Sequence, residues 1–244
     1  MMARDGFEVF DYDPRVARWA AVARSVAQTL ADDPNMRAKN LRHGDTWFVG
    51  VDALPNAVDG AIKGVPLDGP WANQVPDLPH HAAQVSIVYP GYPKQDATES
   101  DANHRFRIRR CAAHVDGLLP KGPARRRFAC EYHAYILGIP LNLAPSAPTM
   151  VWRGSHHIMK AALRDAIGDR PIGSVDVTEV YQAARRAVFE RCERVAIGVV
   201  PGQSFLIHRF ALHGTAPWEG PVAAGRMIAF LRPEFPDPQD WLMS

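Results

Sequence analysis

The 244-residue sequence has few cysteines, almost no net charge and no long apolar run. Its three cysteines, Cys111, Cys130 and Cys192, form no CxxC pair, which argues against a disulfide framework and a thiolate zinc site. A net charge of +2 argues against nucleic acid as the main partner. No stretch approaches the ~20 apolar residues of a membrane span, and the charged amino-terminal segment does not resemble a signal peptide. These absences predict a soluble, cytoplasmic protein without a membrane partner, and they indicate no oligomeric state.

Hydrophobic residues make up 47% of the chain, which is enough for a sizeable core and predicts a single domain over residues 1–244. Residues 1–104 are expected to be a helical and irregular elaboration. A helix is predicted to begin at Pro14, because Asp13 can cap it and proline suits the first helical position. From 41 to 104, frequent prolines exclude long helices.

Residues 105–232 are predicted to form the core, with residues 233–244 as a tail. This region contains short apolar runs separated by glycine and proline, and the segment RFRIRRCAAHVDG alternates like a strand. One helix is expected over 177–194, where Asp176 and Glu179 have the spacing of an N-terminal cap. The pattern predicts a mainly β protein, a barrel or sandwich with helices on its outside.

The candidate metal ligands begin with His114 and Asp116. In a strand, residues two apart point to the same face, so both side chains can reach one ion. His208 and His213 are the candidates for a third ligand. Two histidines and one carboxylate leave positions open on a metal, which is the arrangement of non-haem iron(II) oxygenases. The same HxD pattern recurs at His43, but in a polar context before the strand-rich region.

Arg226 follows these histidines in an apolar segment, AGRMIAFL. A hairpin would bring its guanidinium back beside the metal, where it could bind a carboxylate through two hydrogen bonds. The alternative is a strand residue that points to solvent. Its apolar neighbours favour a buried position, and a buried charge requires a partner.

Together these segments resemble the phytanoyl-CoA dioxygenase family of iron(II)- and 2-oxoglutarate-dependent oxygenases. The resemblance covers about residues 105–232 and rests on four ordered pieces: HVDG, RGSHH, PGQSFLIHRFALHGTAP and the strand with Arg226. The sequence departs from the family at two positions. Arg153 stands where a proline usually precedes the GSH turn, and Trp218 follows Pro217 where the family commonly has an asparagine.

The resemblance implies a double-stranded β-helix (jelly roll, cupin-like) core with flanking α-helices. It implies Fe(II) on His114, Asp116 and His213, with 2-oxoglutarate held by Arg226 and assisted by Thr215, and O2 as the co-reactant. His213 is preferred to His208 because Gly-Thr follows it and because it lies nearer Arg226. An odd spacing would also put the two histidines on opposite faces of a regular strand.

The implied reaction is hydroxylation of an unactivated C–H of a small organic substrate, with release of succinate and CO2. Asp116 favours it over halogenation, since halogenating relatives have a small residue there. Desaturation, epimerisation or cyclisation at the same site is the alternative, as is a catalytically silent β-helix that binds a ligand. The candidate substrate residues are Arg105, Arg107 and Arg109, which would share one strand face and bind an acidic group or line a solvated edge, together with Tyr132 and Trp47.

Overall fold

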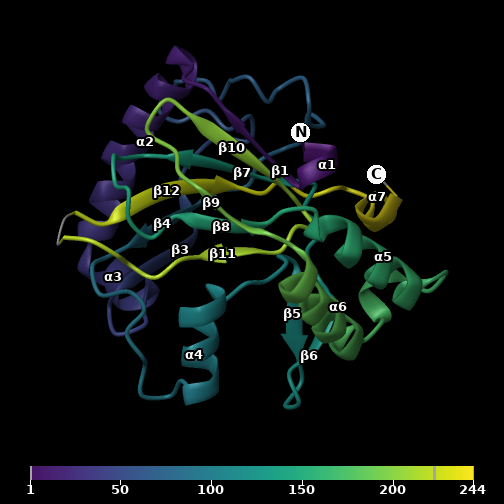
Figure 1. Cartoon of the computed structure of the whole chain (residues 1–244). Coiled ribbons are helices and arrows are strands. Elements are labelled where there is room, and N and C mark those ends of the chain that lie inside the picture. The colour runs from purple at the N-terminus through teal and green to yellow at the C-terminus, as the bar shows by residue number, and fades with distance from the viewer. Residues whose placement is uncertain (1, 222–223, 244) are drawn as a thin grey trace.

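The computed structural model describes residues 2–221 and 224–243, which form two antiparallel sheets packed face to face (Figure 1). The larger sheet has the strand order β1-β10-β7-β12-β4-β3-β2. Its strands are β1 (Phe7–Phe10), β2 (Leu41–Arg42), β3 (Trp47–Leu54), β4 (Ala83–Val88), β7 (Tyr135–Pro140), β10 (Ser204–His208) and β12 (Arg226–Leu231).

The smaller sheet has the order β11-β8-β9. It consists of β8 (Thr149–Trp152), β9 (Arg194–Ile197) and β11 (His213–Thr215), and a separate hairpin is formed by β5 (Leu118–Lys121) and β6 (Arg126–Ala129). The two sheets share a layer of apolar side chains. Those residues are Ile136, Val151, Ile197, Phe205, Ile207, Ala211 and Ile228. Burying each large side chain stabilises the fold by roughly 1.5–3 kcal/mol.

Helix α2 (Pro14–Asp32) covers the larger sheet, after the short helix α1 (Met2–Asp5), and leads into α3 (Pro34–Asn40). The Asp13 side chain caps α2 by accepting a hydrogen bond of 2.8 Å from the Arg15 amide, as predicted. Its apolar stripe is buried, and Trp19 is fully enclosed. The helix therefore follows from its cap and from its 3.6-residue apolar period.

The other helices lie beside the smaller sheet. Figure 1 shows α5 (Ser155–Ile167) next to α6 (Thr178–Arg191), with α7 (Pro238–Met243) nearby. A 3-10 turn, η1 (Ile172–Ser174), joins α5 to α6. The predicted helix near 177–194 is thus confirmed as α6, and Trp241 of the tail is buried against Phe210. None of the helices in the described part of the chain is both long and apolar enough to cross a membrane.

The mainly β architecture with flanking helices is confirmed, but three expectations about its parts are wrong. Residues 1–104 are more than an elaboration, because they supply β1, β2, β3 and β4 of the larger sheet. Residues 101–110 form helix α4 (Asp101–Arg110) and no strand. Strands β11 and β12 form no hairpin: β11 pairs with β8, whereas β12 pairs with β4 and β7.

Candidate metal centre

His114, Asp116 and His213 come together from two segments distant in sequence. His114 follows α4 and forms an isolated backbone bridge with His213, the first residue of β11. The His114 amide donates to the His213 carbonyl at 2.8 Å, and the return hydrogen bond is 3.0 Å long. The potential ligand atoms of all three side chains lie within 4.8 Å of one another. One metal ion can therefore reach all three.

The backbone fixes which imidazole nitrogen of each histidine faces the metal position. The Nδ1 atoms of His114 and His213 each lie 3.0 Å from a backbone carbonyl, of Ala112 and Ala211 respectively. A carbonyl only accepts, so Nδ1 carries the proton in the neutral ring and Nε2 keeps its lone pair. These Nε2 atoms lie 3.0 Å (His114) and 3.6 Å (His213) from Asp116 Oδ1. Both rings are thus in the tautomer that binds a metal through Nε2.

Asp116 is held ionised although only 10% of its side chain is exposed. Burial alone would raise the pKa of its carboxyl, but the neighbouring His213 and Arg232 side chains hold that pKa well below the ordinary value. The Arg232 Nη1 atom donates to Asp116 Oδ2 at 3.2 Å, so one carboxylate oxygen faces the histidines and the other faces the guanidinium. A charged carboxylate with one free oxygen is a suitable ligand for a divalent cation.

Close backbone approaches hold the ligand segments in place. A Cβ atom on Gly214 would lie 2.1 Å from the Cys111 carbonyl oxygen. Gly117, with φ of +79°, would meet the Glu131 carbonyl at 2.3 Å. Ser155 begins α5 at the GSH turn, and its hydroxyl accepts a hydrogen bond of 2.9 Å from the Leu212 amide. The glycines of HVDG and HGT and the serine of GSH therefore position the three candidate ligands.

The triad opens into a cavity of about 220 Å³. Three residues predicted to bind cofactor or substrate line this cavity: Trp47, Arg107 and Thr215. Three further lining residues were not predicted from the sequence: Tyr92, Thr149 and Arg232. Trp47 comes from β3, where its Nε1 donates to Ser86 Oγ at 3.0 Å. Strand β3, which was not predicted because of the prolines around it, thus forms one wall of the cavity.

The three arginines do not share a strand face, because they lie on α4. Arg107 turns toward the cavity and its Nε donates to Glu99 at 3.2 Å, whereas Arg105 and Arg109 are exposed. Tyr132 is not among the cavity-lining residues, and its ring packs edge-on against Trp241 with 6.2 Å between centroids. Helical periodicity separates side chains that alternation would have aligned.

Arg226 is buried on β12, with 4% of its surface exposed. None of its three guanidinium nitrogens has a hydrogen-bond partner among the described residues, and burial lowers the pKa of the group to about 10. Arg226 borders a neighbouring cavity of about 170 Å³, and Thr149 borders both this one and the cavity of the triad. The Thr149 hydroxyl is likewise buried without a partner in the described chain. These orphaned donors fit an anionic ligand that reaches between the two cavities.

His208 and the second HxD pair lie away from this centre. His208 ends β10 and its Nδ1 accepts from the Phe210 amide at 3.1 Å; burial lowers the pKa of its imidazole to about 3. It is separated from His213 by a turn between two sheets, so the expected alternation along one strand does not apply. His43 stacks on Trp47, and the adjacent Asp45 is exposed. Neither belongs to the group around Asp116.

Solved structures with a similar backbone include enzymes described as non-heme and alpha ketoglutarate dependent. SnoK, described as a non-heme alpha ketoglutarate dependent carbocyclase from nogalamycin biosynthesis, aligns over 96% of this chain and 81% of its own, with a TM-score of 0.57 and 12% identity. SnoN, described as the epimerase of that biosynthesis, aligns over 96% and 79%, with a TM-score of 0.51 and 13% identity. The chain has their fold. It is a double-stranded β-helix with flanking helices, as the resemblance to the phytanoyl-CoA dioxygenase family implies. No protein-family model and no curated protein sequence matches the chain.

Within this double-stranded β-helix, Arg232 and Thr149 are two of the residues that were not predicted from the sequence. Arg232 follows β12, six positions after Arg226, so an alternating pattern could have suggested that both point inward. Thr149 begins β8 opposite Thr215, and only the strand register reveals this pairing. No local motif marks either residue.

Proposed function

We propose that this chain is an Fe(II)- and 2-oxoglutarate-dependent oxygenase of the phytanoyl-CoA dioxygenase type, which hydroxylates an unactivated C–H of a small organic molecule. The observation that carries the proposal is the group of His114, Asp116 and His213, with both Nε2 lone pairs turned toward one carboxylate oxygen. Two imidazoles and a carboxylate would hold Fe(II) and leave positions open for other ligands. Asp116 occupies the position that a halide would need, which disfavours halogenation.

The buried groups without hydrogen-bond partners support 2-oxoglutarate as the cosubstrate. Arg226 offers three unpartnered guanidinium nitrogens, and Thr149 offers an unpartnered hydroxyl. A dicarboxylate that reached Arg226 would exchange an unpaired buried charge for a bidentate ion pair. Thr215, which lines the cavity beside His213, would add a further hydroxyl. Iron and 2-oxoglutarate, when bound, would supply an oxidant from O2 with release of succinate and CO2.

The substrate would enter the cavity in front of the triad. Trp47 and Tyr92 provide aromatic surface there, with ring centroids 5.9 Å apart, and Phe230 adds a third apolar wall. Arg107 is the cavity-lining cation on the α4 side; it would bind an acidic or carbonyl group of the substrate and orient its apolar part toward the metal. The walls would also exclude water while the target C–H is attacked.

A second outcome at the same site is cyclisation, epimerisation or desaturation. The solved structures with this fold include enzymes described as a carbocyclase and as an epimerase. Hydroxylation remains the main proposal because it requires no further protein group beyond those that bind iron, 2-oxoglutarate and substrate.

The product's mass distinguishes these outcomes. The iron-loaded protein would be incubated with 2-oxoglutarate and 18O2 across acyl-CoA, amino-acid and terpenoid-acid substrates, with succinate and products read by mass spectrometry. We expect one substrate to stimulate succinate release and to gain one labelled oxygen. A product two hydrogens lighter would contradict hydroxylation in favour of desaturation or ring closure, and one of unchanged mass would favour epimerisation. Succinate no higher than that of a His114→Ala/His213→Ala protein would contradict the enzyme itself.

A further inference from the structure

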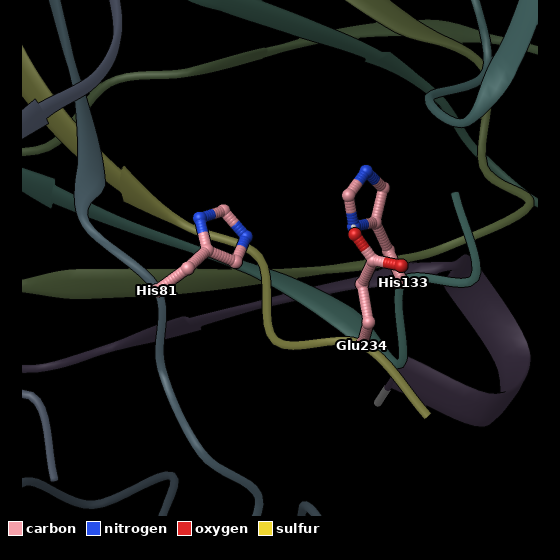
Figure 2. Close-up of side chains that lie close together, drawn as sticks. All are labelled: His81, His133 and Glu234. Atoms are coloured by element: carbon pink, nitrogen blue, oxygen red, sulfur yellow. Dashed lines mark ion pairs between the residues drawn. The ribbon is translucent and has the colours of Figure 1, made fainter. Parts of the chain in front are cut away.

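A second group of side chains that could hold a metal ion lies outside the triad. It consists of His81, before β4, His133, before β7, and Glu234, after β12, and the candidate ligand atoms lie within 4.8 Å of one another. Figure 2 shows the His81 imidazole turned toward the Glu234 carboxylate and the His133 ring. His133 is buried, whereas the His81 and Glu234 side chains are about 40% exposed. The group is thus reachable from solvent on one side.

In each histidine of this group, one ring nitrogen lies within hydrogen-bond distance of a carboxylate oxygen. His81 Nδ1 lies 2.8 Å from Asp52 Oδ1, and His133 Nε2 lies 3.0 Å from Glu131 Oε2. The hydrogen bond from His133 is the largest of the causes that lower the pKa of Glu131, so that carboxylate is ionised and accepts a proton. In a neutral imidazole, these two nitrogens therefore carry the hydrogen.

The remaining nitrogen of each ring then faces an oxygen atom with a lone pair. His81 Nε2 is 3.0 Å and His133 Nδ1 is 3.1 Å from the backbone carbonyl oxygen of Arg232. Lone pair against lone pair is repulsive at this distance unless a cation lies between them. A metal ion relieves the repulsion at both rings, and carboxylate partners on the far nitrogens are what histidine ligands of metals ordinarily have.

Glu234 is oriented to complete such a site. Its Oε2 accepts from the Tyr132 amide at 3.2 Å, while Oε1 lies 4.0 Å from His133 Nδ1. The segments on either side are fixed by backbone hydrogen bonds, from Ala134 to the Pro233 carbonyl at 2.8 Å and from Phe235 to the Tyr132 carbonyl at 2.9 Å. One carboxylate oxygen is thus committed to the backbone and the other is turned to the histidines.

We propose that His81 Nε2, His133 Nδ1, Glu234 Oε1 and the Arg232 carbonyl oxygen form a second site for a divalent cation of the zinc type. Two imidazoles with oxygen ligands suit Zn²⁺, which accepts four ligands of mixed nitrogen and oxygen type. The site would tie the segment before β4, the segment before β7 and the end of β12 together. Zinc binding there does not require the proposed oxygenase activity, since the site uses none of the triad's side chains.

The position of this site gives it a role beyond local stability. The Arg232 carbonyl faces the second group, while the Arg232 guanidinium contacts Asp116 Oδ2 at 3.2 Å. A cation on the carbonyl would fix the backbone from which that guanidinium extends. Arg232 would therefore be a positioning residue that links the two metal sites.

Zinc titration of a protein without the first site tests the proposal. In a His114→Ala/His213→Ala protein, which keeps the Asp116–Arg232 pair, we expect one Zn²⁺ per chain in competition with a chromophoric chelator. Adding His81→Gln or Glu234→Gln should weaken this binding by more than about 100-fold, whereas adding His157→Gln, an exposed histidine of α5, should leave it unchanged.

A milder variant guards against loss of folding. Asp52→Asn keeps every ligand and suits the positive φ of 53° at this position, yet it removes the carboxylate from His81. We expect zinc affinity to fall about 10-fold or more, with an unchanged circular dichroism spectrum. Absence of zinc binding to the folded His114→Ala/His213→Ala protein would overturn the proposal and leave the two rings as hydrogen-bond partners of Asp52 and Glu131. The proposal would also be overturned if the added His81→Gln and Asp52→Asn changes left the zinc affinity equal to that of the His114→Ala/His213→Ala protein.

Discussion

Replacing Asp116 with alanine is expected to abolish iron-dependent succinate formation. Asp116 is the only anionic member of the triad, and its removal leaves the Arg232 guanidinium without the carboxylate that it contacts at 3.2 Å. An uncompensated guanidinium beside two imidazoles would repel a divalent cation. Loss of a ligand exceeds the 10- to 100-fold cost typical of outer-shell changes, so Fe(II) affinity should fall by more than about 100-fold. Iron content after gel filtration and succinate release measure the two effects.

Asp45→Asn is the control for this variant, because it also removes a carboxylate and asparagine suits the positive φ of 65° at this position. Asp45 belongs to the other HxD segment and is exposed, so both iron content and turnover should match those of the unchanged protein. Thermal unfolding of the apoproteins would verify that both variants fold. Full succinate-coupled activity in the Asp116→Ala protein would show that the ligand assignment is wrong.

Replacing Arg226 with methionine is expected to weaken 2-oxoglutarate binding while making the apoprotein more stable. Its guanidinium is fully buried without a hydrogen-bond partner among residues 2–221 and 224–243, which costs free energy in the empty protein. Hydrophobic replacement of buried charged groups is often neutral or stabilising by about 1–4 kcal/mol. Loss of one partner of a buried ion pair with the ligand costs about 2–5 kcal/mol, or a factor of roughly 30 to several thousand in Kd.

The Arg226→Met variant is informative because the stability of the apoprotein should rise while its affinity for 2-oxoglutarate falls. Urea unfolding of the apoprotein gives the stability, and isothermal titration with 2-oxoglutarate in the presence of Fe(II) gives the affinity. Arg24→Met, the same change on the exposed side of α2, should alter neither. Unchanged 2-oxoglutarate affinity in the Arg226→Met protein would refute the role of Arg226 in binding the cosubstrate.

Features set by local chemistry were predictable from the sequence. The cap at Asp13 and the apolar stripe that contains Trp19 specify α2, because both act within one helix. The apolar runs that became β7, β8 and β10 are buried at almost every position, and such runs indicate strands wherever they stand. The association of His114 with Asp116 also followed from their two-residue spacing, although His114 is an isolated bridge residue and Asp116 lies in a turn, so the pair is on no regular strand.

Features set by tertiary packing were not predictable in the same way. In α4, the alternation of arginine with Phe106 and Ile108 imitates a strand, although Ser100 caps a helix by accepting from the Asn103 amide at 3.3 Å. No residue of α4 is fully buried, so no helical apolar stripe marks it. Prolines around β3 and β4 suggested irregular structure, yet they stand in the connections and leave the strands intact.

The electrostatic surroundings of the candidate site depend on residues that are distant in the chain. The contact of Arg232 with Asp116 joins positions 116 residues apart, and the facing of Thr149 and Thr215 depends on the register of β8 against β11. Sequence spacing gives candidate ligands of a metal, but it does not give the groups that set the charge around them.

The most direct test of the central claim is a spectrum of the unchanged protein. Fe(II) and 2-oxoglutarate are added to the anaerobic apoprotein, and the visible region is recorded before and after each addition. We predict a metal-to-ligand charge-transfer band that appears only when both are present, saturates at one iron per chain and is lost in the His114→Ala/His213→Ala protein. A spectrum without this band at saturating Fe(II) and 2-oxoglutarate would contradict the account and favour a β-helix that binds a ligand without oxygenase chemistry.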